Sequence, residues 1–341
     1  MHVKERFQNN FDFLRIFAAL CIILFHSFGL LGRMKSEPLF MFTKGRINFS
    51  FIGLSIFFCI SGYLIAKSAV KSPTVKNYLW KRFLRIQPLL IVLCLLTIFL
   101  LGPFFTHLTL KQYFLDFKTY TYFRNVFPFL GIQFTLPGLF HNLRDSGVNG
   151  SLWTLIVEER LYLLMTIIFL YRKDKAWYLF LLIILINIVF IINRFFFYGE
   201  MIPYLSGAPF FYSLLFLNSA GLYLIKFDFS KFLFLTIIVA AICFFMGIVF
   251  PKLDILYIFS LPLLIISVGK IKGATNYFGK YGDFTYGIYV FSFPVQQVLV
   301  TKGISNPYLL FFLTLLIVLP MAILSWNFIE KEFLKLKRLV K

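Results

Sequence analysis

Long apolar runs, separated by short polar and basic stretches, recur along the whole chain. Most of these runs approach the roughly 20 residues that an α-helix needs to cross the hydrocarbon core of a bilayer. The pattern predicts an all-α, polytopic transmembrane bundle of about ten spans, forming a single membrane domain over residues 1–341 with no appended soluble domain. The expected spans are 11–31, 49–66, 86–105, 152–171, 176–192, 209–225, 232–250, 255–268, 284–301 and 308–329.

Composition supports a membrane protein and changes how the high positive charge is interpreted. The chain has 341 residues, is 60% hydrophobic and carries a formal net charge of +20. In a soluble protein this charge would suggest a nucleic-acid partner. Here the Lys and Arg residues gather between the apolar runs, and they are about twice as frequent on the side of the N-terminus as on the opposite side. We therefore expect a multi-pass protein of the inner (cytoplasmic) membrane with both termini in the cytoplasm, in contact with lipid and not with nucleic acid.

The four cysteines lie inside apolar runs, at spacings typical of neither a disulfide framework nor a zinc site. We interpret them as small buried hydrophobic residues, and we expect no metal. The first apolar run is long and lacks a small-residue cleavage site, so we expect it to remain as a span.

The longest connection, residues 106–150, is aromatic and punctuated by Pro and Gly. Connections of this length are usually functional or hold structure of their own. We expect this one to face outward, with part of it dipping into the membrane.

The first span carries three ionisable residues, Asp12, Arg15 and His26. A charge at bilayer depth costs about 2.5 kcal/mol or more, so it needs a partner or a function. Arg15 and His26 are eleven residues apart, which places them on nearly the same helix face and roughly 16 Å apart along the axis. Asp12 precedes Arg15 by three residues and can pair with it on that face. The pattern favours a functional face on this helix, with His26 towards the outer half of the membrane.

The fourth span contains the consecutive charges Glu158, Glu159 and Arg160. Glu158 is expected at a depth similar to that of His26, where a carboxylate can orient an imidazole that acts as a general base. The alternative is that either carboxylate pairs with a cation to hold the bundle together. For Glu159 and Arg160 we favour such a structural pair.

A basic segment lies where the third span begins. Arg82 and Arg85 are one helical turn apart, and together with Lys81 they can hold a phosphate group. Control of topology and contact with anionic lipids is the alternative, and on the residues alone it is favoured. In the second span, Ser61-Gly62-Tyr63 interrupts the apolar run. There a glycine usually permits close helix packing, and Tyr63 is placed to reach a polar cavity.

Six phrases, in chain order and spread over the whole sequence, resemble those of the acyltransferase-3 family of integral membrane O-acyltransferases. FDFLRIFAALCIILFHS resembles the family's first helix, whose mark is an Arg and a His separated by ten residues, as Arg15 and His26 are. The others are FIGLSIFFCISGYLI, WKRFLRIQP, NGSLWTLIVEERLY, YFGKYGDFTYGIYVFSFPV and SWNFIEKEFLK. Two of the phrases depart from the family pattern. Ser292 stands where a His is common, and Lys331-Glu332 replaces the usual Pro of the closing phrase.

The resemblance implies an enzyme that moves an acyl group, often acetyl, from cytoplasmic acyl-CoA to a hydroxyl of a glycan or lipid-linked sugar at the outer face. Acyl-CoA is the donor substrate, and no permanently bound cofactor is implied. His26 would act as general base or as transient acyl carrier. By this resemblance the catalytic residues are His26, Glu158, Arg15 and Asp12, the acyl-CoA-binding residues are Lys81, Arg82, Arg85, Ser61 and Tyr63, and the acceptor side holds Trp153, Tyr286 and Tyr289.

Two other classes of membrane protein remain open at this point. A transporter or exporter of polysaccharide or lipid-linked sugar also has many spans and intramembrane charges. The chain shows no inverted repeat and no paired Gly/Pro-broken helices, which disfavours this alternative. A sensory or scaffold protein would leave the Arg15–His26 face unexplained.

Overall fold

The computed structural model describes residues 9–169, 177–197, 202–229, 231–280 and 282–340. The basic stretch 172–175, expected between two spans, lies outside them. The described residues form helices and no strand, with one isolated antiparallel bridge between Thr106 and Leu139, so the all-α prediction is confirmed. The main helices are α2 (Phe11–Leu30), α4 (Phe49–Lys71), α5 (Val75–Leu96), α9 (Trp153–Leu164), α10 (Trp177–Phe196), α11 (Ala208–Leu224), α12 (Leu233–Val249), α13 (Tyr257–Lys270), α14 (Thr285–Thr301) and α15 (Pro307–Ser325).

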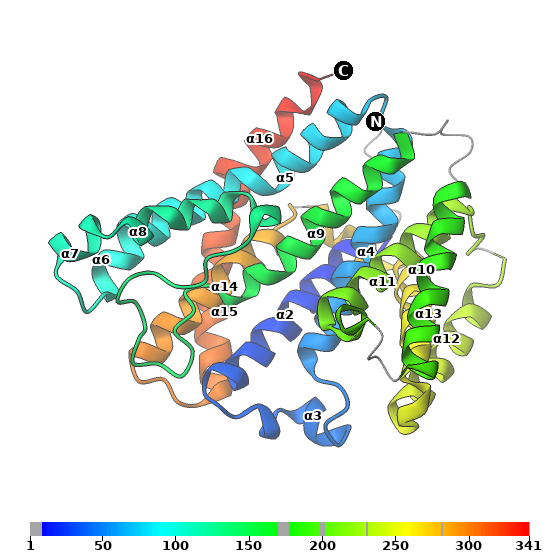
Figure 1. The fold of residues 1–341 in the computed structure, drawn as a ribbon, viewed down its shortest axis with the longest axis horizontal. Helices are drawn as coiled ribbons and strands as arrows, with labels where there is room; N and C mark the ends of the chain where they lie inside the picture. The colour runs from blue at the N-terminus through cyan, green and yellow to red at the C-terminus, as the bar shows by residue number, and fades with distance from the viewer. Residues whose placement is uncertain (1–8, 170–176, 198–201, 230, 281, 341) are drawn as a thin grey trace. The chain divides into compact units, whose positions relative to one another are not determined.

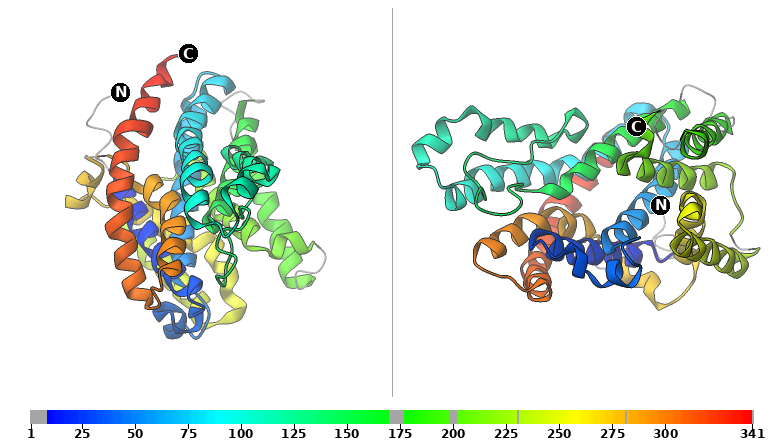
Figure 2. Two further views of the ribbon diagram at one scale, coloured as in Figure 1. Left: turned by 90° about the vertical axis from the view of Figure 1, so that its left-hand side faces the viewer. Right: turned by 60° about the horizontal axis from the view of Figure 1, so that its bottom comes forward.

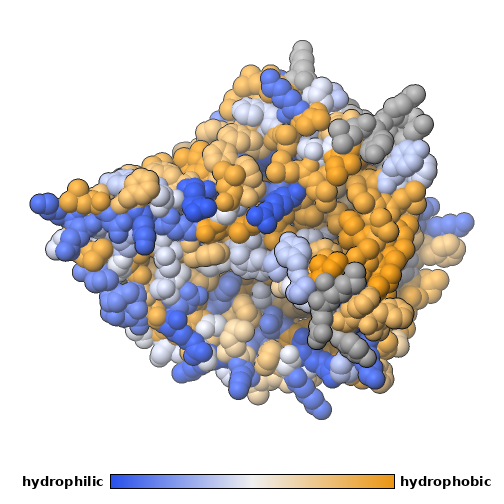
Figure 3. Space-filling view, viewed as in Figure 1, coloured by the Kyte–Doolittle hydropathy of each residue, from blue (hydrophilic) through white to orange (hydrophobic). Residues whose placement is uncertain are grey.

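Six helical stretches in the described part of the chain are long and apolar enough to cross a membrane. They are Phe11–Leu30, Phe49–Lys71, Val75–Phe105, Trp177–Phe196, Pro251–Lys270 and Pro307–Arg338. The helices α11 and α12 are apolar but shorter. Many apolar side chains of α10 and α12 are exposed, among them Leu185, Phe234 and Phe245, and Figure 3 shows the hydrophobic surface over these helices. The chain is therefore a multi-pass helical membrane protein, with six of the ten expected spans meeting the criteria of length and composition.

The basic segment before the third expected span is helical, whereas we expected the span to begin only at Ile86. Helix α4 continues to Lys71 and α5 begins at Val75. Thr74 accepts a hydrogen bond from the Asn77 backbone N–H at 3.1 Å, as an N-cap does. Lys and Arg are good helix formers, so the helices extend past their apolar portions.

One compact unit comprises residues 1–18, 51–78 and 161–281. In it α10, α11, α12 and α13 pack side by side, and α4 packs on α11. A Cβ at Gly62 would lie 2.0 Å from the carbonyl oxygen of Phe216, so only glycine permits this approach. The interpretation of Gly62 as a packing residue is confirmed.

The second compact unit comprises residues 19–50, 79–160 and 282–341. Helices α14 and α15 pair as an antiparallel hairpin, seen in both views of Figure 2. Helix α5 continues through a π-helical turn, η2 (Thr97–Leu101), into α6 (Gly102–Phe105). Two further short helices, α7 (Leu110–Leu115) and α8 (Phe117–Thr121), follow in the long connection.

Part of the long connection, residues 110–130, folds back along α5, and we call it the arm. The Tyr113 hydroxyl donates to the Ile98 carbonyl at 3.0 Å, and farther on Cys94 contacts the Tyr122 carbonyl. Successive residues of the arm thus meet successively earlier residues of the α5–η2 helix. A cluster of buried apolar residues packs around these contacts. It includes Cys94, Ile98, Tyr113, Tyr122, Val126, Leu136, Leu139, Phe140 and Val148. Burial, with a smaller contribution from Tyr120, raises the pKa of Tyr113 to about 12.

Candidate active site

One face of α14 carries three aromatic residues, all of them within the phrase YFGKYGDFTYGIYVFSFPV. Tyr286, Tyr289 and Phe293 are spaced by three and four residues, so they share a helix face over about 10 Å. Their contacts within the second unit reach α2, the start of α9 and α5. This face therefore connects three polar or ionisable clusters.

His26 lies at the Phe293 end of this face. Its imidazole packs edge-on against the rings of Phe293, at 5.1 Å between centroids, and of Phe25, at 5.4 Å. In the described part of the chain the imidazole makes no hydrogen bond, so Glu158 does not orient it directly as expected. Gly150 makes room for Phe293, because a Cβ there would lie 2.8 Å from the ring.

The turn of α2 that carries His26 is held by Gln296, which the sequence reasoning missed. The Gln296 amide donates to the Ile23 carbonyl at 2.9 Å and to the Ser27 hydroxyl oxygen at 2.8 Å. Its neighbour Gln297 donates to carbonyls of residues 145 and 147 at the end of the long connection. Two adjacent amides inside an apolar run were a readable signal, since a buried amide needs several partners.

Tyr289 anchors the start of α9. Its hydroxyl donates to the Ser151 carbonyl at 2.7 Å and lies 2.6 Å from the Thr154 hydroxyl. The predicted acceptor residue Trp153, half-buried, lies between these two contacts in sequence. Ser292, at the family's His position, is buried and donates to the Tyr289 carbonyl of its own helix, at 3.0 Å.

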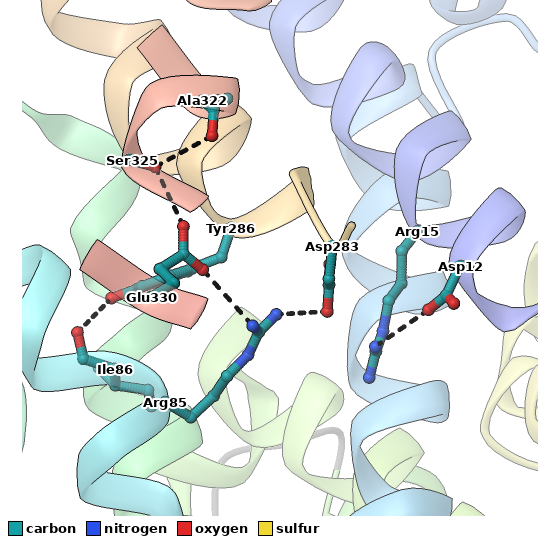
Figure 4. Close-up of polar contacts among 9 residues, drawn as sticks. All are labelled: Asp12, Arg15, Arg85, Ile86, Asp283, Tyr286, Ala322, Ser325 and Glu330. Carbon is teal, nitrogen blue, oxygen red and sulfur yellow. Dashed lines mark hydrogen bonds and ion pairs between the residues drawn. The ribbon is translucent and has the colours of Figure 1, made fainter. Parts of the chain in front are cut away.

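Arg85 occupies the other end of the face, between two carboxylates (Figure 4). Its guanidinium lies 2.6 Å from Asp283 and 3.4 Å from Glu330, and it is 5.8 Å from the centre of the Tyr286 ring. The Tyr286 hydroxyl donates to the Ile86 carbonyl at 3.1 Å. Arg85 therefore links α5 with the entry of α14 and with Glu330 inside the Pro307–Arg338 stretch.

A π-helical turn, η11 (Trp326–Glu330), brings Glu330 into this cluster. The side chain of Glu330 is only 2% exposed, and it also accepts a hydrogen bond from Ser325 at 3.0 Å. A π turn shifts the side chains that follow it around the helix, and such turns recur at functional sites. Glu330 was absent from the predicted site, although it lies in a motif that resembles the family's closing phrase.

The consecutive glutamates of α9 face different partners. Glu158, half-buried, interacts electrostatically with Tyr286 and Tyr289. Glu159 is buried and accepts hydrogen bonds from the Gln87 amide, at 2.5 Å, and from the Phe129 backbone N–H of the arm, at 2.9 Å.

The expected pair of Glu159 with Arg160 is wrong. Adjacent helical residues point about 100° apart. Arg160 is accordingly exposed while Glu159 is buried, and the structural role of Glu159 is to fasten the arm.

The other predicted residues lie in the first unit or beside Arg85. Arg15 pairs with Asp12 at 3.8 Å, as the spacing predicts (Figure 4). Tyr63 is buried and Ser61 half-buried on α4. Lys81 and Arg82, both half-buried, precede Arg85 on α5 and have interactions of their own. Among the described residues no group of three or more His, Cys, Asp or Glu residues is placed to hold a metal ion.

Comparison with known proteins adds a family. A family model described as an acyltransferase domain, of the acyltransferase-3 type, matches residues 8–327. An O-acetyl transferase of Shigella phage Sf6 is 29% identical over 96% of this chain and 96% of its own length. Nodulation protein 10 of Rhizobium leguminosarum bv. viciae is 33% identical over 49% of this chain and 46% of its own length. No solved structure matches significantly.

Proposed function

Because the chain belongs to the acyltransferase-3 family and is a membrane O-acetyltransferase, we propose that it takes acetyl from cytoplasmic acetyl-CoA. The acceptor we propose is a hydroxyl of a glycan, either a surface polysaccharide or a lipid-linked sugar of the cell envelope. The observation that carries this proposal is the single helix α2, which presents Arg15 and His26 on nearly one face, about 16 Å apart along its axis. The family match supplies the reaction class for that pair.

The charge distribution supports a donor side at the cytoplasmic surface of the inner membrane. Loops on the side of the N-terminus hold most of the Lys and Arg, which favours the cytoplasm for that side. Arg15 and the Lys81–Arg85 turn then lie on the side from which an anionic CoA head group approaches. His26 lies farther along α2, towards the acceptor.

In the proposed reaction His26 acts on the acceptor hydroxyl. An imidazole nitrogen takes the hydroxyl proton as the oxygen attacks the thioester carbonyl. The carbon–sulfur bond then breaks, CoA leaves as the thiolate, and the proton passes to it from the imidazolium.

In the alternative, an imidazole nitrogen attacks the thioester carbonyl, the carbon–sulfur bond breaks and CoA leaves as the thiolate. The acceptor oxygen then attacks the acetyl-imidazole, the carbon–nitrogen bond breaks, and the hydroxyl proton passes to the thiolate. Both routes need an imidazole nitrogen that is not already engaged, and the ring contacts of His26 leave its nitrogens available.

The supporting residues position these groups. Glu158, beside Tyr286 and Tyr289, is proposed to line the acceptor side together with Trp153. Gln296 and Phe293 fix the turn and the ring of His26. Asp12 holds Arg15.

The test uses protein purified into nanodiscs, with acetyl-CoA as donor. Release of free CoA is measured for wild type, His26→Ala and Arg15→Ala, and thermal unfolding is measured for each to show that it is folded. Release that is lost in folded His26→Ala supports the proposal. If wild-type protein is folded but does not bind acetyl-CoA, the proposal fails and an exporter without acyl chemistry becomes the better hypothesis.

A further inference from the structure

Lys270 is a charged residue of the first unit that no sequence motif singled out. It is the last residue of α13, and its side chain is half-buried. Its ammonium lies over the ring of Tyr63, 5.1 Å from the ring centre. Tyr63 belongs to the Ser-Gly-Tyr phrase that was predicted to contact the donor.

The backbone around Lys270 is firmly built. Asn10, just before α2, donates its backbone N–H to the Gly269 carbonyl and its side-chain amide to the Ile271 carbonyl, both at 2.8 Å. It also accepts a hydrogen bond from Thr275 at 2.7 Å. Phe11 packs where a Cβ of Gly269 would be, 2.1 Å from its nearest ring atom. The start of α2 and the end of α13 are thus fixed to one another on both sides of Lys270.

Among the described residues, the neighbouring charges do not neutralise Lys270. Asp12 lies against Gly279 and pairs with Arg15. Within the part of the chain that the structure describes, no carboxylate lies within ion-pair distance of the Lys270 ammonium. A half-buried ammonium that lies over an aromatic face keeps most of its capacity for an anion, because the face supplies only a modest attraction and no lone-pair acceptor.

Arg85, one of the cations predicted to hold the donor, has a different electrostatic environment. Arg85 is bridged by two carboxylates of the second unit, which offset its charge. Lys270 has no such offset in the described ranges, and an ammonium on a flexible stem binds phosphate as a point charge.

We infer that Lys270, with the ring of Tyr63 beneath it, binds a phosphate ester. Its source is the 3′-phosphate or pyrophosphate of acyl-CoA. This inference rests on the proposed function, and it assigns a donor contact to the end of α13. The same chemistry is offered by the head group of an anionic lipid, so the experiment separates the two sources.

The experiment measures binding of tritiated acetyl-CoA to the full-length protein in nanodiscs, which needs no acceptor. Lys270→Met removes the charge and keeps the apolar stem, and Lys270→Arg keeps the charge. The matched control is Lys272→Met, which removes the same charge from an exposed residue two positions away. Unlabelled S-acetylpantetheine, which has the thioester but no phosphate, competes with the label in each variant.

We expect Lys270→Met to weaken acetyl-CoA binding about tenfold, equivalent to about 1.4 kcal/mol. The inhibition constant of S-acetylpantetheine should stay within twofold, Lys270→Arg should restore most of the affinity, and the Lys272 control should bind as wild type. A lipid source predicts a different pattern. Acetyl-CoA affinity is then unchanged, and native mass spectrometry shows less co-purified phosphatidylglycerol in Lys270→Met only.

Two outcomes overturn the inference. Equal weakening of acetyl-CoA and S-acetylpantetheine would mean that Lys270 only supports the fold around Tyr63. Unchanged binding of both acetyl-CoA and lipid would mean that it holds no phosphate. Failure of the proposed function is separately visible, because wild-type protein would then not bind acetyl-CoA at all.

Discussion

Replacing Arg85 with Ala should destabilise the protein even when no donor is present. Arg85 is the cation between Asp283 and Glu330, and Glu330 is only 2% exposed. Removing one partner of a buried ion pair leaves an uncompensated charge, at a cost of roughly 3–5 kcal/mol. The half-buried Asp283 adds less, because solvent screens it. At about 2 °C per kcal/mol for a chain of this size, the unfolding temperature should fall by on the order of 5–10 °C.

The protein carries a built-in reporter for this measurement. Cys21, Cys59 and Cys94 are free and buried, so a thiol-reactive fluorophore labels them as the helices separate. Unfolding is followed in detergent, without acetyl-CoA, for wild type, Arg85→Ala, Glu330→Gln and the double variant. Because Glu330→Gln removes the charge that Arg85→Ala strands, the double variant should be more stable than Arg85→Ala alone.

The competing hypothesis is that Arg85 serves mainly to bind the donor. It predicts an unchanged unfolding temperature for donor-free Arg85→Ala, together with loss of acetyl-CoA binding. It also predicts no rescue by Glu330→Gln. Either observation would refute the assignment of Arg85 as an ion-pair clamp.

Three further changes test other parts of the structure. Gly150→Ala should lower activity several-fold at nearly unchanged stability, because the new Cβ displaces the Phe293 ring, which packs against the His26 imidazole that we propose to be catalytic. Gly273→Ala, with nothing within 4 Å of its new Cβ, is the control, and equal activity of the two variants would contradict this. Glu159→Ala should expose the arm to limited proteolysis, since it loses its hydrogen bond to the arm backbone; unchanged cleavage would show that the arm is held elsewhere. Between about pH 10 and 12 the stability of the wild-type protein should fall as pH rises, because the unfolded chain releases the Tyr113 proton that the folded protein keeps. Tyr113→Phe should lose less stability over this range, and unfolding temperatures at pH 9 and 11 will show the difference.

The sequence predicted the helices well because a membrane-spanning helix is a local property of composition. The expected spans coincide with α2, α10, α11, α12 and α14 to within a few residues. The packing role of Gly62 and the pairing of Asp12 with Arg15 were also readable, since both follow from helix geometry and spacing alone.

Partners that are distant in sequence could not be predicted in the same way. In the sequence, Arg85 is one of several cations in a basic segment. Nothing near it shows that its partners, Asp283 and Glu330, lie 198 and 245 residues away. The sequence suggests that Glu159 pairs with its neighbour Arg160, yet its partners are on α5 and in the arm. The arm itself is set by contacts of Tyr113 and its neighbours with the turn after α5, which hydropathy does not encode.

The buried and half-buried polar groups are of two kinds. In one kind the cost of burial is offset by hydrogen bonds within the fold, and in the other it is not. Glu159 and Glu330 each accept hydrogen bonds from two separate residues, so their burial is explained by the bonds they make. In the described part of the chain His26 packs against two aromatic rings and makes no hydrogen bond, and the ammonium of Lys270 lies over an aromatic ring. A group that is costly to bury, and whose burial is not offset within the fold, is retained because it meets something the fold does not contain. We propose that for the imidazole this partner is the acceptor hydroxyl or the thioester, and that for the ammonium it is a phosphate.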